Sequence, residues 1–426
     1  MPADLPPIPG RSRAVYTVGG KEPRRFGRRR RARFDSPSGS SRKTYQAHGR
    51  PAGRRWLRRI LIALSVLIPL VLVAGIAGYV DVKVRLDSIP KLPVPALTPE
   101  KSGQPIDILL VGSDSRDLSC AKTAAGVKAF GSSSTTTGQR SDVIIVVRLI
   151  PSTDTVEMLS IPRDTWVPIA GTGGSDKINA AFNNGPNQLV QTIQDNFHIP
   201  INHVMIANFC GFEGMVNSLG GISLDFRYPV RDAYSGLRIN TTGCQLINGT
   251  QALALVRSRH LYYFKHGAWN YDGLSDWSRI RRQQAFFHAL LNKVHGVFPN
   301  VFELNSFLGA TVSDLTVDSS FGGGELISLG LKYHSLSESN LITSVLPTYS
   351  QVIDGQDALI TAQPYANNLI RSFLARGTTP VAPGSSKASA GSSPKTTTTT
   401  GSTVPPAGVV TDTPQSDPEP WNPIPC

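Results

Sequence analysis

Residues 142–162 read DVIIVVRLIPSTDTVEMLSIP and contain two runs of β-branched and large apolar residues. Runs of this length and composition are typical of strands. Similar runs recur along the chain, at IDILLVG (106–112), HVMIANF (203–209) and ISLDF (222–226). They alternate with segments whose apolar spacing is helical, namely NQLVQTIQDNF (187–197), GFEGMVNSLGG (211–221), NGTQALALVRSRH (248–260) and LSDWSRIRRQQAFFHALLNKV (274–294). This alternation predicts a single layered α/β domain with a central mixed sheet flanked by helices.

The composition changes on both sides of this region. We expect residues 105–377 to form the domain and the Pro-rich stretch 81–104 to be a linker in front of it. After residue 377 the chain is rich in Thr, Ser and Pro, which predicts a disordered tail over residues 378–426.

An apolar stretch precedes the linker. Residues 60–80 read ILIALSVLIPLVLVAGIAGYV and carry no charge, and a helix of this length crosses a bilayer. A cleaved signal peptide fits less well, because its apolar core is usually only about 7–15 residues long. The basic sequence GRRWLRRI (53–60) lies directly before it, and such residues stay on the cytoplasmic side. We therefore expect a single-pass protein of the cell membrane with a cytoplasmic N-terminus and an extracytoplasmic domain.

The net charge of +13 comes from one end of the chain. Residues 1–59 hold 17 basic and three acidic side chains, whereas the rest of the chain holds 26 basic and 27 acidic ones. The first 59 residues are also poor in aliphatic side chains, so we expect a disordered basic tail. Such a tail suits anionic lipid headgroups, and no nucleic-acid-binding motif accompanies it, so we expect membrane lipid and not nucleic acid as its partner.

All four cysteines lie beyond the apolar stretch, where disulfides persist outside the cell. Four cysteines allow three full pairings, and the sequence does not choose among them. The polar surroundings of Cys120 and Cys244 favour a bond between those two, whereas Cys210 has the surroundings of a small buried residue.

Arginine and aspartate gather where the predicted strands and helices begin or end. The pairs are Asp114 with Arg116, Arg140 with Asp142, Arg163 with Asp164, and Arg257 with Arg259. Each pair alone also fits a strand end that reaches solvent, but ligands of α/β sheets bind at strand ends. Guanidinium groups match phosphate oxygens, and carboxylates beside them suit a hard divalent cation that couples to phosphate. No Walker loop or Gly-x-Ser-x-Gly elbow is present, so the pattern indicates arginines for a pyrophosphate and aspartates for Mg²⁺.

A further cluster begins a helix. Asp276 has the character of an N-cap, which puts Arg279, Arg281 and Arg282 in the first turns. Cations are mildly unfavourable there because of the helix dipole. A solvated arginine face is one explanation, and a shared anionic ligand is the other.

In order along the chain, LLVGSDSR, GQRSDVIIVV, LSIPRDTWV, DKINAAF, LINGTQALALVRSRH and DWSRIRRQQ resemble the successive motifs of the LytR-CpsA-Psr family. The resemblance implies an extracytoplasmic, Mg²⁺- or Mn²⁺-dependent phosphotransferase. Such an enzyme moves a glycopolymer from a polyprenyl-pyrophosphate carrier onto peptidoglycan in cell wall assembly. It implies metal binding by Asp114 and Asp142, and a set of catalytic residues that bind the pyrophosphate: Arg163, Arg257, Arg259, Arg279 and Gln283, with Arg140 as a further pyrophosphate-binding residue. Arg279 and Gln283 are four apart, so one helical face presents both.

The lipid chain of such a carrier needs an apolar slot, for which Phe209, Phe212, Phe286 and Leu290 are candidates between sheet and helices. Trp269 and Tyr271 are candidates to stack on sugar rings. Three alternatives stay open: a pyrophosphatase that uses water as acceptor, a non-catalytic wall lectin or scaffold, and a transcriptional attenuator. The polymer also stays open among arabinogalactan, teichoic acid and capsule, although the Arg, Ala, Gly and Pro content favours an actinobacterial arabinogalactan.

Overall fold

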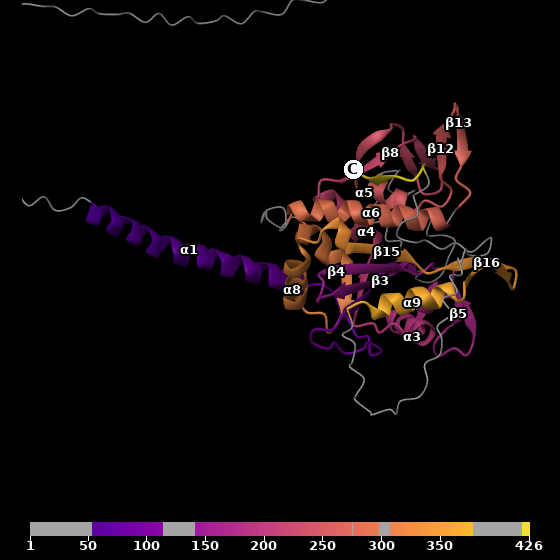
Figure 1. The fold of residues 1–426 in the computed structure, drawn as a ribbon, viewed down its shortest axis with the longest axis horizontal. Coiled ribbons are helices and arrows are strands. Elements are labelled where there is room, and N and C mark those ends of the chain that lie inside the picture. The colour runs from indigo at the N-terminus through magenta and orange to yellow at the C-terminus, as the bar shows by residue number, and fades with distance from the viewer. Residues whose placement is uncertain (1–52, 114–140, 275, 298–306, 378–419) are drawn as a thin grey trace, which may run out of the picture. The chain divides into compact units, whose positions relative to one another are not determined.

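A computed structural model of the 426-residue chain describes residues 53–113, 141–274, 276–297, 307–377 and 420–426 (Figure 1). Asp114, Arg116, Cys120 and Arg140 lie outside the described residues, as does the basic tail up to residue 52. The chain divides into two compact units after Leu67, and the domain described below belongs to the second, Ile68–Cys426.

A mixed sheet forms the centre of the domain, as the sequence predicted. Its seven described strands run in the order β1 (Lys91–Leu92), β14 (Leu315–Asp318), β7 (His203–Ala207), β2 (Ile106–Ser113), β3 (Ser141–Ile150), β4 (Thr155–Ser160) and β15 (Leu341–Val345). The pairs β1/β14, β7/β2 and β4/β15 are parallel, and the other neighbours are antiparallel.

Helices cover both faces of this sheet. Successive side chains of a strand point to opposite faces, so Leu109 and Ile108 enter different cores. Leu109 packs in the core with residues of α3 (Pro186–Phe197) and α9 (Tyr365–Ala375), and Ile108 in the core with residues of α6 (Asp276–Val297) and α8 (Gly323–Tyr333). Figure 1 shows α6 on one side of β3 and β4, and α3 and α9 on the other. Burial on both faces explains why the strands are apolar runs without alternation.

A third core lies around the other face of α6. It joins α4 (Phe209–Ser218) and α5 (Gly249–Arg257) to β8 (Ile222–Phe226) and β11 (Gly243–Ile247). Asn208 caps α4, and Asn248 forms a capping box at the start of α5, which fixes where each helix begins. A side chain at Gly249 would collide with the backbone of Glu213, so the close approach of α4 and α5 requires glycine there.

Smaller elements surround these layers. A four-stranded sheet runs in the order β10 (Leu237–Ile239), β9 (Val230–Asp232), β12 (Tyr262–Lys265) and β13 (Ala268–Tyr271). Among the described residues, two hairpins join β5 (Trp166–Pro168) to β6 (Ser175–Lys177) and β16 (Thr348–Ile353) to β17 (Gln356–Thr361). Further short elements are the strand β18 (Ile424–Pro425) and the 3₁₀ helices η2 (Ile178–Asn184), η3 (Val312–Asp314) and η4 (Glu338–Asn340).

The apolar stretch forms most of helix α1 (Gly53–Asp87). Its segment Ala63–Asp87 is long and apolar enough to cross a membrane, judged by length and composition alone. The stretch 81–104, expected to be a linker, instead packs with the domain. Residues 81–87 continue the helix, β1 joins the sheet, and Ile89 and Val94 are buried. Single apolar residues between the prolines thus pack in the core, although the overall composition of this stretch suggested a linker.

The last seven residues, 420–426, also belong to the domain, and we name them the C-terminal strap. Strand β18 pairs with β8, Trp421 stacks on Tyr263 at 4.7 Å, and Asn422 is buried. Cys426 forms a disulfide with Cys244. The expected disordered tail is therefore wrong for these residues, because a short apolar segment follows the Thr- and Pro-rich stretch.

Two cysteine expectations are also corrected. Cys244 bonds Cys426, so its expected bond to Cys120 is wrong. Cys210 is disulfide-bonded rather than a buried small residue. The polar loop around Cys244 did not reveal its partner, because Cys426 lies 182 residues further along the chain.

Candidate functional site

Asp142, the second residue of β3, is the centre of a cluster of arginines. Arg163 Nη1 donates to its Oδ1, and Arg257 Nε lies 3.8 Å from its Oδ2. Burial alone would raise the pKa of Asp142, but the charges of Arg163, Arg279 and Arg257 outweigh it and hold the pKa below its ordinary value. Asp142 therefore stays ionised, and three distant segments of the chain bring positive charge to it.

A second carboxylate, Asp164, extends this cluster. Its Oδ2 lies 3.6 Å from Arg163 Nε and 3.2 Å from Arg259 Nη2, and its Oδ1 lies 3.9 Å from Lys177 Nζ. Arg163 therefore contacts both carboxylates. We name Asp142, Arg163, Asp164, Arg257, Arg259 and Arg279 the arginine network. Lys177, which adds to the cluster, carries no signal in the sequence beyond its place in DKINAAF.

A tied turn after β4 fixes Arg163 and Asp164. Thr165 donates through both its backbone N–H (3.0 Å) and its hydroxyl (2.6 Å) to Pro162 O. Asn179 N–H then donates to Arg163 O at 3.1 Å, and Leu359 N–H to Asp164 O at 2.9 Å. The backbone of both site residues is thereby held to η2 and β17, which leaves their side chains to the network.

Asp232 fixes the turn that carries Arg257 and Arg259. Its Oδ2 accepts from Ser258 Oγ at 2.7 Å and from the backbone N–H groups of Arg259 and His260 at 3.1 and 3.0 Å. Burial would raise the pKa of Asp232, but these hydrogen bonds lower it below its ordinary value. Sequence reasoning missed this residue, because a lone aspartate in FRYPVRDAY has no pattern that marks it. Arg257 is held further by the ring of Phe209, 4.2 Å below its guanidinium carbon.

The arginines of α6 separate into two roles. Arg279 is buried, and its charge acts on Asp142. Arg282 is fully buried elsewhere: its guanidinium donates to Asp272 Oδ2 (3.2 Å), Asn422 Oδ1 (2.8 Å) and Ser258 O (2.6 Å). The explanation by one shared anion therefore does not hold for Arg282, which binds the C-terminal strap.

Gln283 lies one turn after Arg279 on α6. Its amide nitrogen donates to Val256 O at 3.0 Å, which holds α6 against the end of α5. The residue also lines the cavity described next. One helical turn of α6 thus presents Arg279 and Gln283 on the same side, as their spacing predicted.

An apolar cavity of about 410 Å³ opens beside the arginine network. Its polar lining includes Asp142, Arg257, Arg279 and Gln283. The rest is almost wholly apolar. It comes from β2, β7, α4, α5 and α6, from residues 307–312, and from single residues of α1, β3, β14 and α8. All four aromatic and aliphatic candidates from the sequence, Phe209, Phe212, Phe286 and Leu290, line it. Charged groups and apolar walls in one cavity suit a ligand with an anionic head and a hydrocarbon chain.

A second hollow, of about 600 Å³, lies over the four-stranded sheet. Tyr234, Tyr262, Trp269 and Arg231 are among its lining residues, and the guanidinium carbon of Arg231 stacks 4.0 Å above Trp269. Asp232 lines this hollow and also fixes the turn of Arg259, so hollow and network share a wall. Tyr271 lies beside Tyr262 at 5.3 Å between ring centroids.

The described residues provide one of the two expected metal ligands. Asp142 is an ionised carboxylate on the cavity wall, which fits a hard cation such as Mg²⁺. Ser113, the residue before Asp114, pairs with Ser141, the residue before Asp142. Asp114 and Arg140 themselves lie outside the described residues.

Comparison with known proteins gives consistent results. The sequence profile of the LytR_cpsA_psr family matches residues 79–372. LcpB of Corynebacterium glutamicum, a probable cell wall biosynthesis protein, is 32% identical over 260 residues, 60% of this chain and 57% of that protein. TagU of Halalkalibacterium halodurans, a polyisoprenyl-teichoic acid–peptidoglycan teichoic acid transferase, is 30% identical over 220 residues, 51% of this chain and 62% of that protein. The chain thus spans less than two thirds of the length of these relatives.

A solved structure is similar over most of its own length. The LytR-Csp2A-Psr enzyme from Actinomyces oris superposes with a TM-score of 0.54 at 25% identity, covering 67% of this chain and 95% of that one.

Proposed function

The chain belongs to the LytR-CpsA-Psr family, and we propose that it is a membrane-anchored phosphotransferase of cell wall assembly. In this proposal it transfers a glycopolymer from a polyprenyl-pyrophosphate carrier to peptidoglycan and releases polyprenyl phosphate. Helix α1 anchors it, with the N-terminus in the cytoplasm and the domain outside, as the basic residues before the apolar stretch favour.

One observation carries the proposal: Arg163, Arg257 and Arg279 converge on Asp142 beside a cavity with apolar walls. A pyrophosphate bears several negative charges and is matched by guanidinium groups. A polyprenyl chain has no polar group to satisfy, so an apolar cavity of about 410 Å³ takes part of it. The pyrophosphate head of the carrier thus meets guanidinium groups, and its hydrocarbon chain meets apolar walls.

The reaction follows from this placement. A sugar hydroxyl of peptidoglycan attacks the phosphorus next to the glycopolymer, and the bond from that phosphorus to the bridging oxygen breaks. The electron pair leaves with polyprenyl phosphate, whose developing charge the arginines stabilise. The hydroxyl proton passes to a base, and the lowered pKa of Asp142 makes that residue a weak acceptor.

We propose that Asp142, together with Asp114, holds Mg²⁺ or Mn²⁺. When bound, such an ion supplies charge neutralisation of the phosphate oxygens. Arg163 contacts both Asp142 and Asp164, so Asp164 would still hold Arg163 if a metal ion engaged Asp142.

The hollow beside the network suits the saccharide part of a substrate. Trp269 and Tyr262 offer ring faces, and Arg231 offers donors to sugar hydroxyls. Since Asp232 joins the hollow to the turn of Arg259, a polymer lying there has its reducing end at the network.

A pyrophosphatase that releases the polymer phosphate to water uses the same residues, so the products must decide. The full chain in detergent, with Mg²⁺ and a polyprenyl-pyrophosphate-linked glycan, is incubated with and without peptidoglycan. Polymer bound covalently to peptidoglycan supports the transferase. Free glycan phosphate in equal yield with and without peptidoglycan supports the pyrophosphatase.

The same assay is repeated with teichoic acid and with arabinogalactan precursors to identify the polymer. Product formation should disappear with a chelator and return with Mg²⁺ or Mn²⁺. Unchanged activity in the chelator would contradict the metal part of the proposal.

A further inference from the structure

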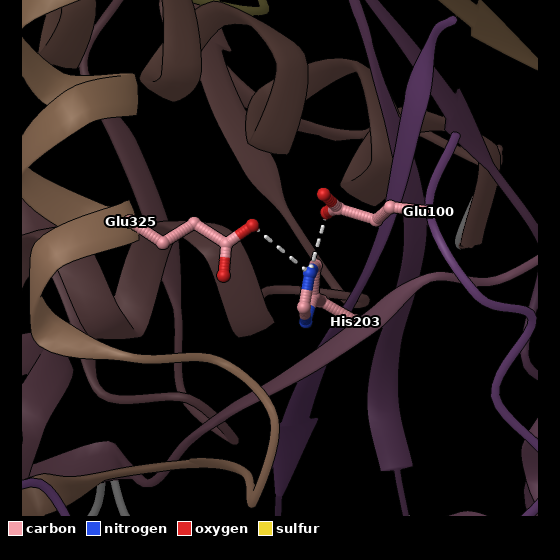
Figure 2. A group of neighbouring side chains, drawn as sticks. All are labelled: Glu100, His203 and Glu325. Carbon is pink, nitrogen blue, oxygen red and sulfur yellow. Dashed lines mark hydrogen bonds and ion pairs between the residues drawn. The ribbon is translucent and has the colours of Figure 1, made fainter. Parts of the chain in front are cut away.

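A second cluster of ionisable groups lies at the beginning of β7, apart from the described residues that line the cavity. Glu100 comes from the segment before β2, His203 is the first residue of β7, and Glu325 is in the first turn of α8 (Figure 2). One ligand atom from each lies within 4.8 Å of the others. His203 Nε2 is 2.6 Å from Glu100 Oε1 and 3.5 Å from Glu325 Oε1.

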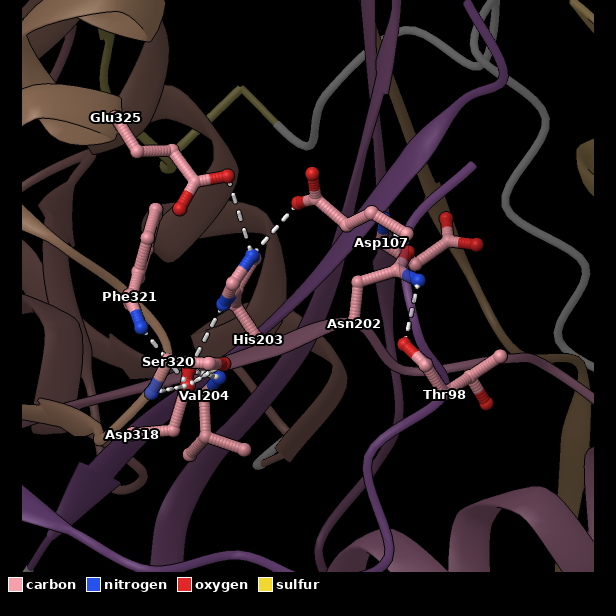
Figure 3. Close-up of polar contacts among 10 residues, drawn as sticks. Thr98, Asp107, Asn202, His203, Val204, Asp318, Ser320, Phe321 and Glu325 are labelled. Atoms are coloured by element: carbon pink, nitrogen blue, oxygen red, sulfur yellow. Dashed lines mark hydrogen bonds and ion pairs between the residues drawn. The ribbon is translucent and has the colours of Figure 1, made fainter. Parts of the chain in front are cut away.

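The other face of the imidazole is fixed. His203 Nδ1 lies 3.0 Å from Asp318 Oδ2, and Asp318 also accepts from the backbone N–H groups of Val204, Ser320 and Phe321 (Figure 3). A fully buried carboxylate with so many donors is ionised, so Nδ1 carries the hydrogen and donates it. The ring of Phe321 stacks on the imidazole at 4.1 Å and fixes its plane.

This arrangement leaves the lone pair of Nε2 directed at two carboxylates. Oxygen and nitrogen lone pairs repel at 2.6 Å unless positive charge lies between them. Three carboxylates and one imidazole meet here, and the positive charge is either a proton on Nε2 or a cation. A histidine whose second nitrogen donates to a buried carboxylate is the usual arrangement of a metal-binding histidine.

We propose that Glu100, His203 and Glu325 bind a divalent transition-metal ion, with Zn²⁺ the preferred one. Zinc bonds of about 2.0–2.2 Å in a tetrahedron put neighbouring ligand atoms roughly 3.3–3.5 Å apart. The distance between His203 Nε2 and Glu325 Oε1, 3.5 Å, already has this value. The separation from Glu100 must widen by less than about 1 Å, which its partly exposed side chain permits (34%).

The ligand types separate this ion from the one proposed at Asp142. An imidazole nitrogen favours Zn²⁺, whereas Mg²⁺ prefers oxygen ligands alone. Two partly exposed glutamates leave room for a water as fourth ligand. The ion would tie the first turn of α8 to the beginning of β7, and Leu326, next to Glu325, lines the apolar cavity. The inference does not depend on the transferase reaction.

Metal binding to the full chain tests the proposal directly. The protein, without a polyhistidine tag and stripped by a chelator, is dialysed against Zn²⁺ and its metal content is measured. We expect the wild type to bind one Zn²⁺ more than Glu100→Gln/Glu325→Gln, and Co²⁺ to give a tetrahedral visible spectrum in the wild type but not in this double variant. The Glu338→Gln control removes a glutamate charge elsewhere and should bind as the wild type does.

A positioning variant adds a second readout. Asp318→Asn keeps all three ligands but weakens the hold on Nδ1, and it should lower Zn²⁺ affinity by about 10–100-fold. Circular dichroism and thermal unfolding show that each variant is folded. Equal Zn²⁺ content in wild type and double glutamine variant would overturn the proposal and leave a proton as the occupant. Binding of Mg²⁺ as tight as that of Zn²⁺ would overturn the choice of metal.

Discussion

Removal of the disulfide that ties the C-terminal strap should destabilise the domain without unfolding it. The perturbation is Cys244→Ser/Cys426→Ser, which leaves no unpaired thiol at this site. The bond closes a loop of 182 residues, for which the chain-entropy relation gives about 5 kcal/mol at 25 °C. Measured values for single disulfides are usually about 2–4 kcal/mol, so we expect a loss of about 3–5 kcal/mol.

Thermal unfolding of the full chain in detergent, without reductant, measures this loss. A domain of this size loses roughly 2 °C of Tm for each kcal/mol, so the double serine variant should melt about 5–10 °C lower. A Tm within about 1 °C of the wild type would show that the loop-entropy argument fails here.

Asn422 separates the role of the disulfide from that of the docked strap. Its Oδ1 accepts a 2.8 Å hydrogen bond from the fully buried Arg282, and such bonds to charged groups contribute about 1.5–3 kcal/mol. Asn422→Ala should cost this amount in the wild type and clearly less in the double serine variant, where the strap is undocked part of the time. Equal costs in both backgrounds would mean that the strap stays docked without its disulfide.

Three further changes test the site and the core. Arg163→Ala removes the cation that contacts both carboxylates of the network and should lower kcat/KM by at least about 100-fold. The kcat/KM of Arg163→Lys should lie between those of Arg163→Ala and the wild type. An unchanged kcat/KM in Arg163→Ala would mean that Arg163 takes no part in the reaction. Ala207→Trp fills the apolar cavity and should raise KM for a long-chain carrier at least about tenfold, since each buried methylene contributes about 0.8 kcal/mol. The KM of this variant for a short-chain analogue should stay unchanged, as should both KM values of the exposed control Val352→Trp. Burial raises the pKa of Asp107 to about 6, although the charge of Arg148 opposes this. The native state therefore takes up a proton below pH 6, whereas the unfolded chain does so only near pH 3.8, so protonation stabilises the native state between these values. Tm should rise by a few degrees from pH 7 to pH 5, and by less in Asp107→Asn. Equal slopes for both proteins would refute that pKa.

The layers of the fold were predictable because apolar periodicity reports burial directly. The strands over 142–150 and 155–160 appear where β-branched runs stand in the sequence. The ends of the domain were not predictable from composition. Proline-rich and threonine-rich stretches suggest disorder, yet Val94 and Trp421 on those stretches contact the core. A few apolar residues suffice to dock a segment when a sheet edge or a disulfide holds it, and composition averages them away.

The arginine network was predictable as a set because charged residues at ends of apolar strands have few structural reasons to recur. Its supporting residues were not. Asp232 holds its turn by accepting hydrogen bonds from backbone N–H groups. Any aspartate in a loop can do this, so the sequence does not distinguish Asp232 from the others. Likewise, His203 lies more than 100 residues from both Glu100 and Glu325, and the three meet only where α8 and the segment before β2 pack at the start of β7.

Helix α6 shows how far residue type alone can inform about role. Arg279 and Arg282 are three residues apart, both buried and both arginine. Three residues of a helix correspond to a rotation of about 300°, so the two side chains leave the helix only about 60° apart. Even so, Arg279 acts on Asp142 while Arg282 holds Asp272, Ser258 and the strap. The partners of Arg282 lie 10, 24 and 140 residues away, so no local pattern specifies them. Since one rigid helix carries both arginines, the contacts that fix Arg282 also fix the position from which Arg279 and Gln283 face the cavity.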